Sequence, residues 1–190
     1  MHPTYVLVAL LWNACQQFPH TAELPGLVAD GGSLPGAREL AAFGGLVGSW
    51  DVDVAYPRLD GRVEHRPGEW HFAWILEGRA IQDVRRVTSA DPAATPLSDG
   101  ATISAWDPDL GAWRVSWVSG LSGATTSFVA SAIGGEIVLE SQGEAKVRRR
   151  IFSDITPMSF RWRALGTPDG GRTWVVEQEL TARRRQAGSG

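Results

Sequence analysis

Cysteine and histidine are both scarce in this chain of 190 residues. Cys15 is the one cysteine, which excludes a disulfide within the chain and a zinc site built on cysteine ligands. It precedes the region predicted to form strands, so we do not expect a catalytic thiol. His65 and His71 fall on one strand face, but six residues of extended chain separate them by about 20 Å. A metal ion shared by these two histidines is therefore not expected.

Long apolar runs and a strong charge bias are also missing. The apolar segment at residues 5–12 is too short to span a bilayer and has no lysine or arginine before it, unlike a signal peptide. We therefore expect a cytoplasmic protein without a membrane partner, with a secreted or lipidated form as the alternative. The formal net charge of -3 argues against a nucleic-acid partner, because binding to phosphate backbones depends on a basic face.

Motifs of the common enzyme classes are absent from the sequence. It contains no Gly-x-Ser-x-Gly elbow, phosphate-binding loop, dinucleotide fingerprint or His-Glu-x-x-His helix. Glu177 and Glu179 share a strand, but we interpret them as solvent-facing, which disfavours the paired carboxylates of glycoside chemistry. Neither a cofactor nor a metal is predicted.

Tryptophan, in contrast, is abundant. The chain has nine tryptophans, and all but the first lie in predicted strands, where large aromatic side chains fill a barrel or line a cavity within it. They are Trp12, Trp50, Trp70, Trp74, Trp106, Trp113, Trp117, Trp162 and Trp174.

A regular strand rhythm begins at Leu46. Alternating apolar and polar residues are interrupted by turn signals about every 8 to 12 residues, which is typical of an all-β sandwich or barrel. Short connections such as Glu77-Gly78 predict antiparallel neighbours in a meander, and closure removes the exposed edges of the sheet. The predicted strands are residues 47–56, 63–76, 79–88, 101–107, 112–119, 124–132, 135–142, 145–153, 158–166 and 172–182.

These patterns predict an all-β fold, a closed antiparallel meander β-barrel of about ten strands with a short N-terminal helical cap. The helix-forming residues 36–43 could cover one open end of the barrel. Residues 1–37 are predicted to be an extension and linker, 38–184 the barrel domain, and 185–190 a flexible tail.

The hairpin at Glu77-Gly78 predicts which side chains face the interior. A two-residue turn pairs Trp74 with Ile81 and Phe72 with Asp83. One face then carries Trp70, Phe72, Trp74, Leu76 and Ile81, with Asp83 among them. An inward Asp83 would be a carboxyl group in an aromatic cavity, where it must be paired or have its pKa raised.

Two polar residues stand out on the apolar faces of later strands. Arg149 lies between Val147 and Ile151, and Gln178 lies on the face that includes Trp174. An inward Arg149 would be a counter-ion for Asp83 or for an acidic ligand. A buried ion pair without chemistry and a pair that contacts a ligand both remain open.

Gly48-Ser49-Trp50 at the first strand and the arginines after the last strand resemble the calycin superfamily. There a Gly-x-Trp tryptophan packs near the closed end of the barrel against an arginine, which implies structural roles for Gly48, Trp50 and Arg183 or Arg184. The segments 46–50, 77–83, 105–108 with 111–113, and 160–162 resemble one uncharacterised bacterial group of calycin-like proteins. Nitrobindin-like relatives hold haem through a late histidine, whereas this chain has none after His71. The resemblance implies a cavity and a hydrophobic guest.

Three functions are compatible with these residues. The first is binding of a hydrophobic, aromatic or polycyclic small molecule. The second is a cofactor-independent cyclase or isomerase of secondary metabolism, with Asp83 as acid or base and Arg149 stabilising negative charge. The third is a filled barrel that serves as a structural or interaction module, and a homodimer is an open possibility for all three. The predicted ligand-binding residues are Trp70, Phe72, Trp74, Ile81, Trp113, Trp117, Trp162, Trp174 and Gln178.

Overall fold

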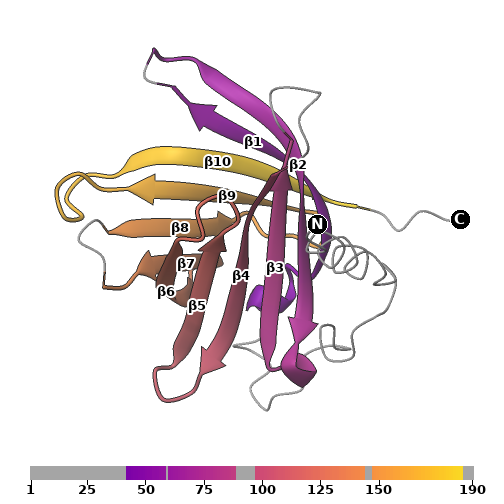
Figure 1. Ribbon diagram of the computed structural model, residues 1–190. Coiled ribbons are helices and arrows are strands. Elements are labelled where there is room, and N and C mark those ends of the chain that lie inside the picture. The colour runs from indigo at the N-terminus through magenta and orange to yellow at the C-terminus, as the bar shows by residue number, and fades with distance from the viewer. Residues whose placement is uncertain (1–41, 59, 89–96, 144–146, 186–190) are drawn as a thin grey trace, which may run out of the picture.

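The computed structural model describes residues 42–58, 60–88, 97–143 and 147–185, and these form a closed antiparallel β-barrel (Figure 1). The order of strands around the barrel is β1-β10-β9-β8-β7-β6-β5-β4-β3-β2. This confirms the predicted fold class. The strands are β1 Gly48–Pro57, β2 Val63–Ile75, β3 Ala80–Val87, β4 Leu97–Asp107, β5 Ala112–Ser119, β6 Thr125–Ile133, β7 Glu136–Ser141, β8 Arg148–Ser153, β9 Ser159–Gly166 and β10 Val175–Arg184.

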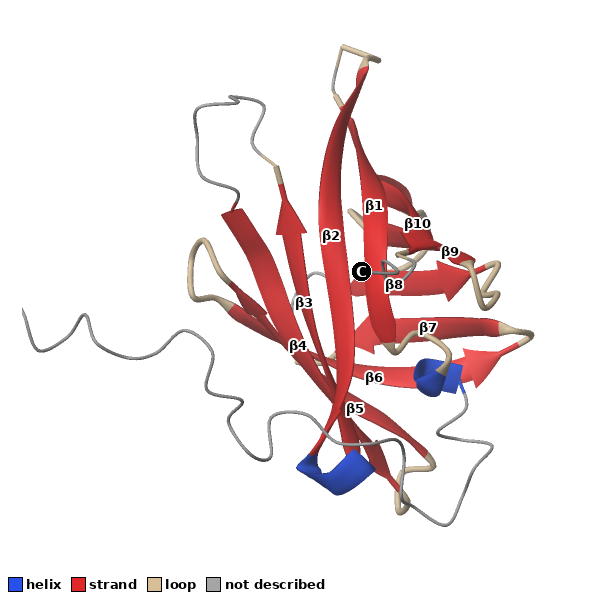
Figure 2. Cartoon of the chain, turned by 90° about the vertical axis from the view of Figure 1, so that its right-hand side faces the viewer, coloured by secondary structure: helices blue, strands red, loops and turns tan. Residues whose placement is uncertain are grey.

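Each strand pairs with its neighbour in sequence, as a meander requires, and β1 pairs with β10 to close the barrel. That closing pair runs from Trp50 opposite Arg184 to Ala55 opposite Glu179. The pairing of β1 with β2 continues further, to Pro57 opposite Val63. The tip of the β1–β2 hairpin therefore projects beyond the body of the barrel, as Figures 1 and 2 show.

The predicted strand limits agree with the structure to within one residue except in β4, β8 and β10. Strand β4 begins at Leu97, whereas the sequence predicted a start at residue 101. The reason is a register shift between Arg85 and Arg86, which lets β3 continue to pair with residues that resemble a turn in sequence. At Gly100 a Cβ atom would overlap the Trp117 indole, so this close approach requires glycine.

A helical turn at residues 42–44 precedes β1, and the remainder of the predicted helix at 36–43 lies outside the described residues. Phe43 packs on Trp113 with 4.7 Å between ring centroids, and both Phe43 and Leu46 are buried. The turn therefore contributes apolar side chains to the core. Among the described residues, no helix combines the length and apolar character needed to cross a bilayer.

Trp50 belongs to the hydrophobic core of the barrel. Its side chain is fully buried, and its ring meets Phe160 edge to face at 4.7 Å. The Trp50 indole N–H donates to the Leu46 carbonyl oxygen at 2.7 Å. The Arg184 guanidinium carbon lies 4.0 Å from the Trp50 ring centroid, a cation–π contact.

The arginine that contacts Trp50 is Arg184, and Arg183 is exposed, which corrects the structural role predicted for Arg183. Strand parity is the reason, because Trp50 lies opposite Arg184 in the ladder and the two side chains share a face. Gly48 has a φ of +132°, and a Cβ atom there would overlap the Arg184 guanidinium. Only glycine satisfies both conditions without strain.

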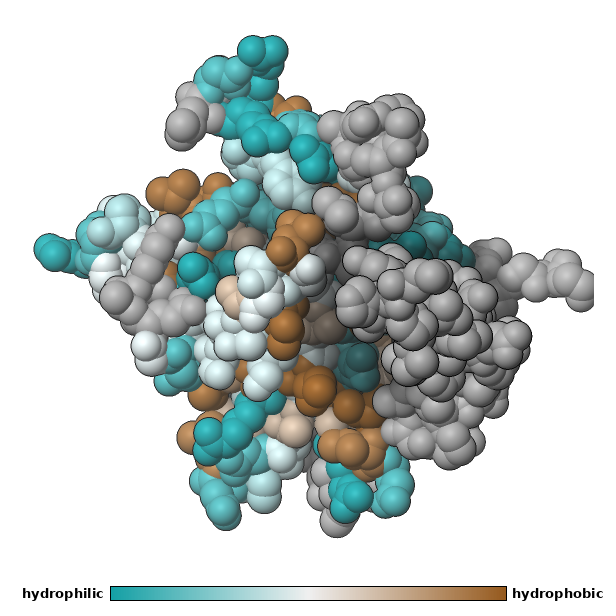
Figure 3. Space-filling view, viewed as in Figure 1, coloured by the Kyte–Doolittle hydropathy of each residue, from teal (hydrophilic) through white to brown (hydrophobic). Residues whose placement is uncertain are grey.

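Polar and apolar side chains are interspersed over the face of the molecule seen in Figure 3. Ile103 of β4 and Val118 of β5 are among the large apolar side chains exposed on the surface. Single exposed apolar residues of this kind are ordinary on a protein surface.

Candidate functional site

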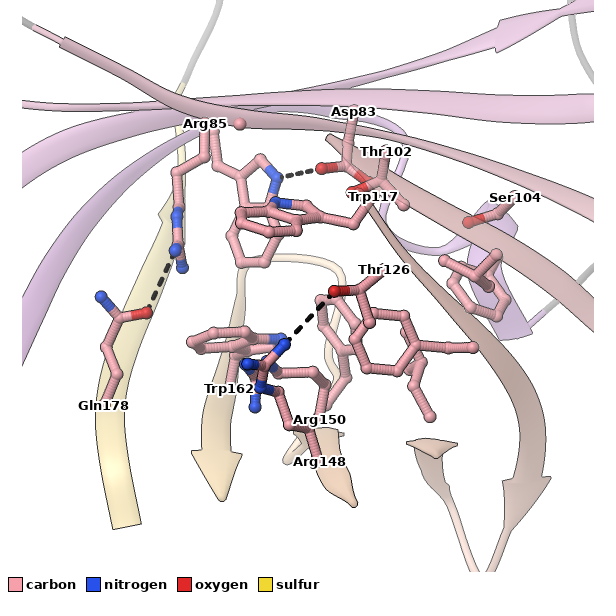
Figure 4. A pocket seen from close by; sticks show the side chains of 17 residues that line it. Asp83, Arg85, Thr102, Ser104, Trp117, Thr126, Arg148, Arg150, Trp162 and Gln178 are labelled. Carbon is pink, nitrogen blue, oxygen red and sulfur yellow. Dashed lines mark hydrogen bonds between the residues drawn. The ribbon is translucent and has the colours of Figure 1, made fainter. Parts of the chain in front are cut away.

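The barrel interior holds a cavity of about 240 Å³ that is partly open to solvent (Figure 4). Every strand except β1 contributes to its wall, and the helical turn adds Phe43. The interior is thus partly filled by core side chains and partly hollow. The wall consists of Phe43, Trp70, Asp83, Arg85, Gly100, Thr102, Ser104, Val115, Trp117, Thr126, Phe128, Leu139, Arg148, Arg150, Phe152, Trp162 and Gln178.

Asp83 faces this cavity from β3. The predicted pairing of Phe72 with Asp83 and of Trp74 with Ile81 is confirmed, and Asp83 is only 7% exposed. The indole N–H of Trp70 donates to Asp83 Oδ1 at 2.8 Å, as the dashed line in Figure 4 marks. The carboxyl group is thus held in one orientation on an aromatic wall.

Burial raises the pKa of the Asp83 carboxyl group from 3.8 to about 7, because a low-dielectric surrounding disfavours the charged form. Three weaker effects act in the opposite direction. Hydrogen bonds from Trp70 and Thr102 and the positive charge of Arg85 all favour the carboxylate. The result is a group that is partly protonated and partly ionised near neutral pH.

Arg85 lies two residues beyond Asp83 on the same face of β3. Its guanidinium carbon lies 4.7 Å from the Trp162 ring centroid and 5.2 Å from that of Trp70. Its Nη2 donates to Gln178 Oε1 at 3.0 Å. Since β3 and β10 are not neighbours in the sheet, this hydrogen bond spans the interior, as Figure 4 shows.

Strand β8 supplies two further arginines, Arg148 and Arg150. The Arg150 guanidinium carbon lies 5.8 Å from the Trp162 ring centroid and 6.0 Å from that of Phe128. Arg148 Nη1 donates to Thr126 Oγ1 at 3.3 Å. Arginines from two strands therefore approach the cavity around Trp162, where the indole face favours cations.

Arg149 does not face the interior, in contrast to the sequence-based expectation. It contacts Glu140 through an ion pair, and its guanidinium carbon lies 4.2 Å from the Trp174 ring centroid. The prediction chose the face of Val147 and Ile151 because those residues are apolar. The buried apolar residue of this strand is instead Phe152, and strand parity then turns Arg148 and Arg150 inward and Arg149 outward.

Trp174 also lies outside the cavity, where it contacts Arg149. The reason is a register shift in β10 between Val176 and Gln178, a β-bulge that reverses which residues face inward. Gln178 lines the cavity as expected, but Trp174, on the other side of the bulge, points outward.

The remaining predicted ligand-binding residues fall into two groups. Trp70, Trp117 and Trp162 line the cavity. Four others are packed in or against the hydrophobic core and are not part of the cavity wall, namely Phe72, Trp74, Ile81 and Trp113.

The predicted site assigned its positive charge to Arg149 and omitted the three arginines that line the cavity, which are Arg85, Arg148 and Arg150. Arg85 could have been found from the sequence, since it shares strand parity with Asp83 and pairs with Trp70. Thr102 could have been found less directly, since it pairs with Asp83 in the next strand. Arg148 and Arg150 carried no such signal, because their direction depends on how β8 packs.

His65 and His71 both contact neighbouring polar side chains. In the described parts of the chain, no group of three histidine, cysteine or acidic side chains is arranged to hold a metal ion. His65 contacts Asp53 at 2.8 Å, and His71 contacts Ser49 at 3.0 Å. Neither histidine is part of the described cavity wall.

No protein-family model matches this chain, and no curated protein matches it in sequence. Solved structures match it in fold. An S-type phycobiliprotein lyase, CPES, from Guillardia theta superposes with a TM-score of 0.54 at 12% identity, over 77% of this chain and 92% of its own. Rv2717c from M. tuberculosis superposes with a TM-score of 0.55 at 16% identity, over 81% of this chain and 100% of its own.

A redesigned β-barrel, mFAP1, bound to DFHBI, matches at 17% identity over 78% of this chain and 99% of its own, but its TM-score of 0.37 is too low to support an argument. At these low identities the first two structures establish a common fold and nothing finer. The chain adopts a calycin-like β-barrel fold.

Proposed function

We propose that this protein binds a small aromatic molecule carrying an acidic group, inside the barrel. The observation that carries the proposal is the composition of the cavity wall. Three indole rings, from Trp70, Trp117 and Trp162, share it with three arginines and a single carboxyl group among the described residues. Apolar cavities with a few convergent polar groups are the usual form of a small-molecule site.

The size of the cavity limits the guest. A dry cavity of roughly 150 Å³ in another protein accepts benzene, whereas this one has about 240 Å³. The additional space suits a second fused ring or a short acidic substituent. The volume within the wall therefore suits one or two rings of the aromatic or polycyclic ligand suggested by the sequence, and a hollow of this size argues against a filled, purely structural barrel.

The charge of the wall favours an acid over a neutral aromatic compound. Guanidinium groups bind carboxylates in a planar, two-pronged geometry. The raised pKa of Asp83, about 7, reduces the opposing negative charge near neutral pH. One structural neighbour is a lyase, so catalysis on the ligand is compatible with this fold and is developed below.

Binding of 2-naphthoate, followed by quenching of tryptophan fluorescence, tests the proposal. The neutral analogue 2-naphthylmethanol has nearly the same shape and serves as the matched ligand. We expect 2-naphthoate to bind at least tenfold more tightly. Arg150→Met should remove most of this preference, because Arg150 is in the cavity wall.

Arg149→Met is the matched control variant, since its side chain points outward to Glu140 and Trp174. It should bind 2-naphthoate as the wild-type protein does. Equal affinity for the acid and the alcohol, with no effect of Arg150→Met, would refute the acidic ligand. Absence of binding by both compounds would refute a cavity for small aromatic molecules.

A further inference from the structure

Asp83 and the arginines of the cavity are positioned to act together on one small molecule. Asp83 is the one carboxyl group among the described wall residues, and Arg85, Arg148 and Arg150 are the cations that share the cavity with it. Asp83 and Arg85 are two residues apart on one strand face, which places their backbone positions about 7 Å apart. A ligand of one or two rings can therefore meet a carboxyl and a guanidinium group at once.

Asp83 is also held in place for proton transfer. The Trp70 N–H fixes Oδ1 at 2.8 Å, and the backbones of both residues are set by the β2–β3 ladder. Burial brings the pKa of Asp83 to about 7, so its ionised and protonated forms coexist at neutral pH. A group with these properties can both accept and return a proton, which is the requirement for general acid–base catalysis.

We propose that the barrel catalyses keto–enol isomerisation of a small aryl-substituted 2-oxo acid, with Asp83 as the group that moves the proton. This rests on the proposed function, because the same cavity must first bind an aromatic acid. Each part of the substrate has a counterpart in the wall. The aryl ring meets the indoles, the carboxylate meets Arg148 and Arg150, and the acidic C–H group lies toward Asp83.

The step is balanced without any further reactant. The Asp83 carboxylate takes a proton from the carbon next to the ketone, the electron pair of that C–H bond becomes the new C=C bond, and the carbonyl π pair moves onto oxygen. The positive charge of Arg85 stabilises the resulting enolate oxygen. Protonated Asp83 then gives its proton to that oxygen, which completes the enol and regenerates the carboxylate.

Phenylpyruvate is the probe, because it combines a single ring, a ketone, a carboxylate and an acidic methylene group. Proton NMR in D₂O measures the exchange of the methylene protons, and tryptophan quenching measures binding in the same samples. We expect the wild-type protein to accelerate exchange above the protein-free rate. Asp83→Asn should lower this acceleration by about 100-fold or more while affinity changes by only a few fold. Arg149→Met should exchange as the wild type does.

Three outcomes separate this inference from the proposed function. Binding of phenylpyruvate without accelerated exchange, or equal exchange by the wild type and Asp83→Asn, would overturn catalysis and leave binding intact. Binding of 2-naphthoate but not of phenylpyruvate would overturn the substrate class. If neither compound bound, the proposed function would fail together with the catalytic step.

Discussion

Asp83→Asn should change how the stability of this protein depends on pH. Asp83 has a pKa of about 7 in the folded protein, compared with 3.8 for an ordinary aspartate. Between these values the folded state holds a proton that the unfolded state has released. The stability associated with this proton is therefore fully present below pH 3.8 and is lost as the pH rises through 7.

The magnitude follows from the two pKa values. A difference of about three pKa units corresponds to about 4 kcal/mol, at about 1.4 kcal/mol per unit. Asparagine has a similar shape and can still accept the Trp70 N–H, but it does not titrate. The free energy of unfolding of Asp83→Asn relative to the wild type should therefore increase by about 2 to 3 kcal/mol from pH 5 to pH 8, and then level off.

Urea unfolding of both proteins at half-unit steps of pH measures this difference. Subtraction removes the contributions of surface carboxyl groups such as Asp107 and Asp169, whose pKa values are lowered by hydrogen bonds and which titrate alike in both proteins. A constant offset between the two curves from pH 5 to pH 8 would show that Asp83 does not titrate near neutrality. The use of Asp83 as both acid and base would then be untenable.

Three further substitutions, two of them with a matched control variant, test the packing and hydrogen bonding of the same interior. Gly48→Ala should lower the free energy of unfolding by about 2 kcal/mol or more, measured by thermal unfolding, because residue 48 has a φ of +132° and a Cβ atom there would overlap Arg184. Gly61→Ala is the control, because residue 61 has a φ of +82° but open space around it, so that this variant reports the backbone strain alone. Arg184→Ala should cost about 2 kcal/mol through loss of its contact with Trp50 and its hydrogen bonds to main-chain carbonyls. The exposed Arg183→Ala should stay within about 0.5 kcal/mol of wild type, and equal effects at the two arginines would contradict the assignment. Trp70→Phe removes the hydrogen-bond donor to Asp83, which lowers the pKa of that carboxyl group. The pH midpoint of the stability loss that accompanies ionisation of Asp83 should therefore move above pH 7 in this variant. An unchanged midpoint would argue against the hydrogen bond.

The sequence by itself determined the all-β meander and the inward direction of Asp83. Both depend on local patterns, because turn residues mark the hairpins and a two-residue period assigns the faces once a turn is located. For Asp83 the turn lies only five residues away, at Gly78, so little could intervene. The resemblance to calycins had limited the arginine near Trp50 to two adjacent candidates, Arg183 and Arg184.

Only the tertiary structure decided which arginines enter the cavity. A bulge at Val176 and Gln178 turned Trp174 outward, and β8 packed through Phe152, which turned Arg148 and Arg150 inward and Arg149 outward. Assigning the more apolar face of each strand to the interior fails where the interior of a barrel is polar, because this rule places charged residues in solvent. The same stretch of three arginines thus appears in sequence as a single charged patch, and in the barrel it contributes to both faces of the sheet.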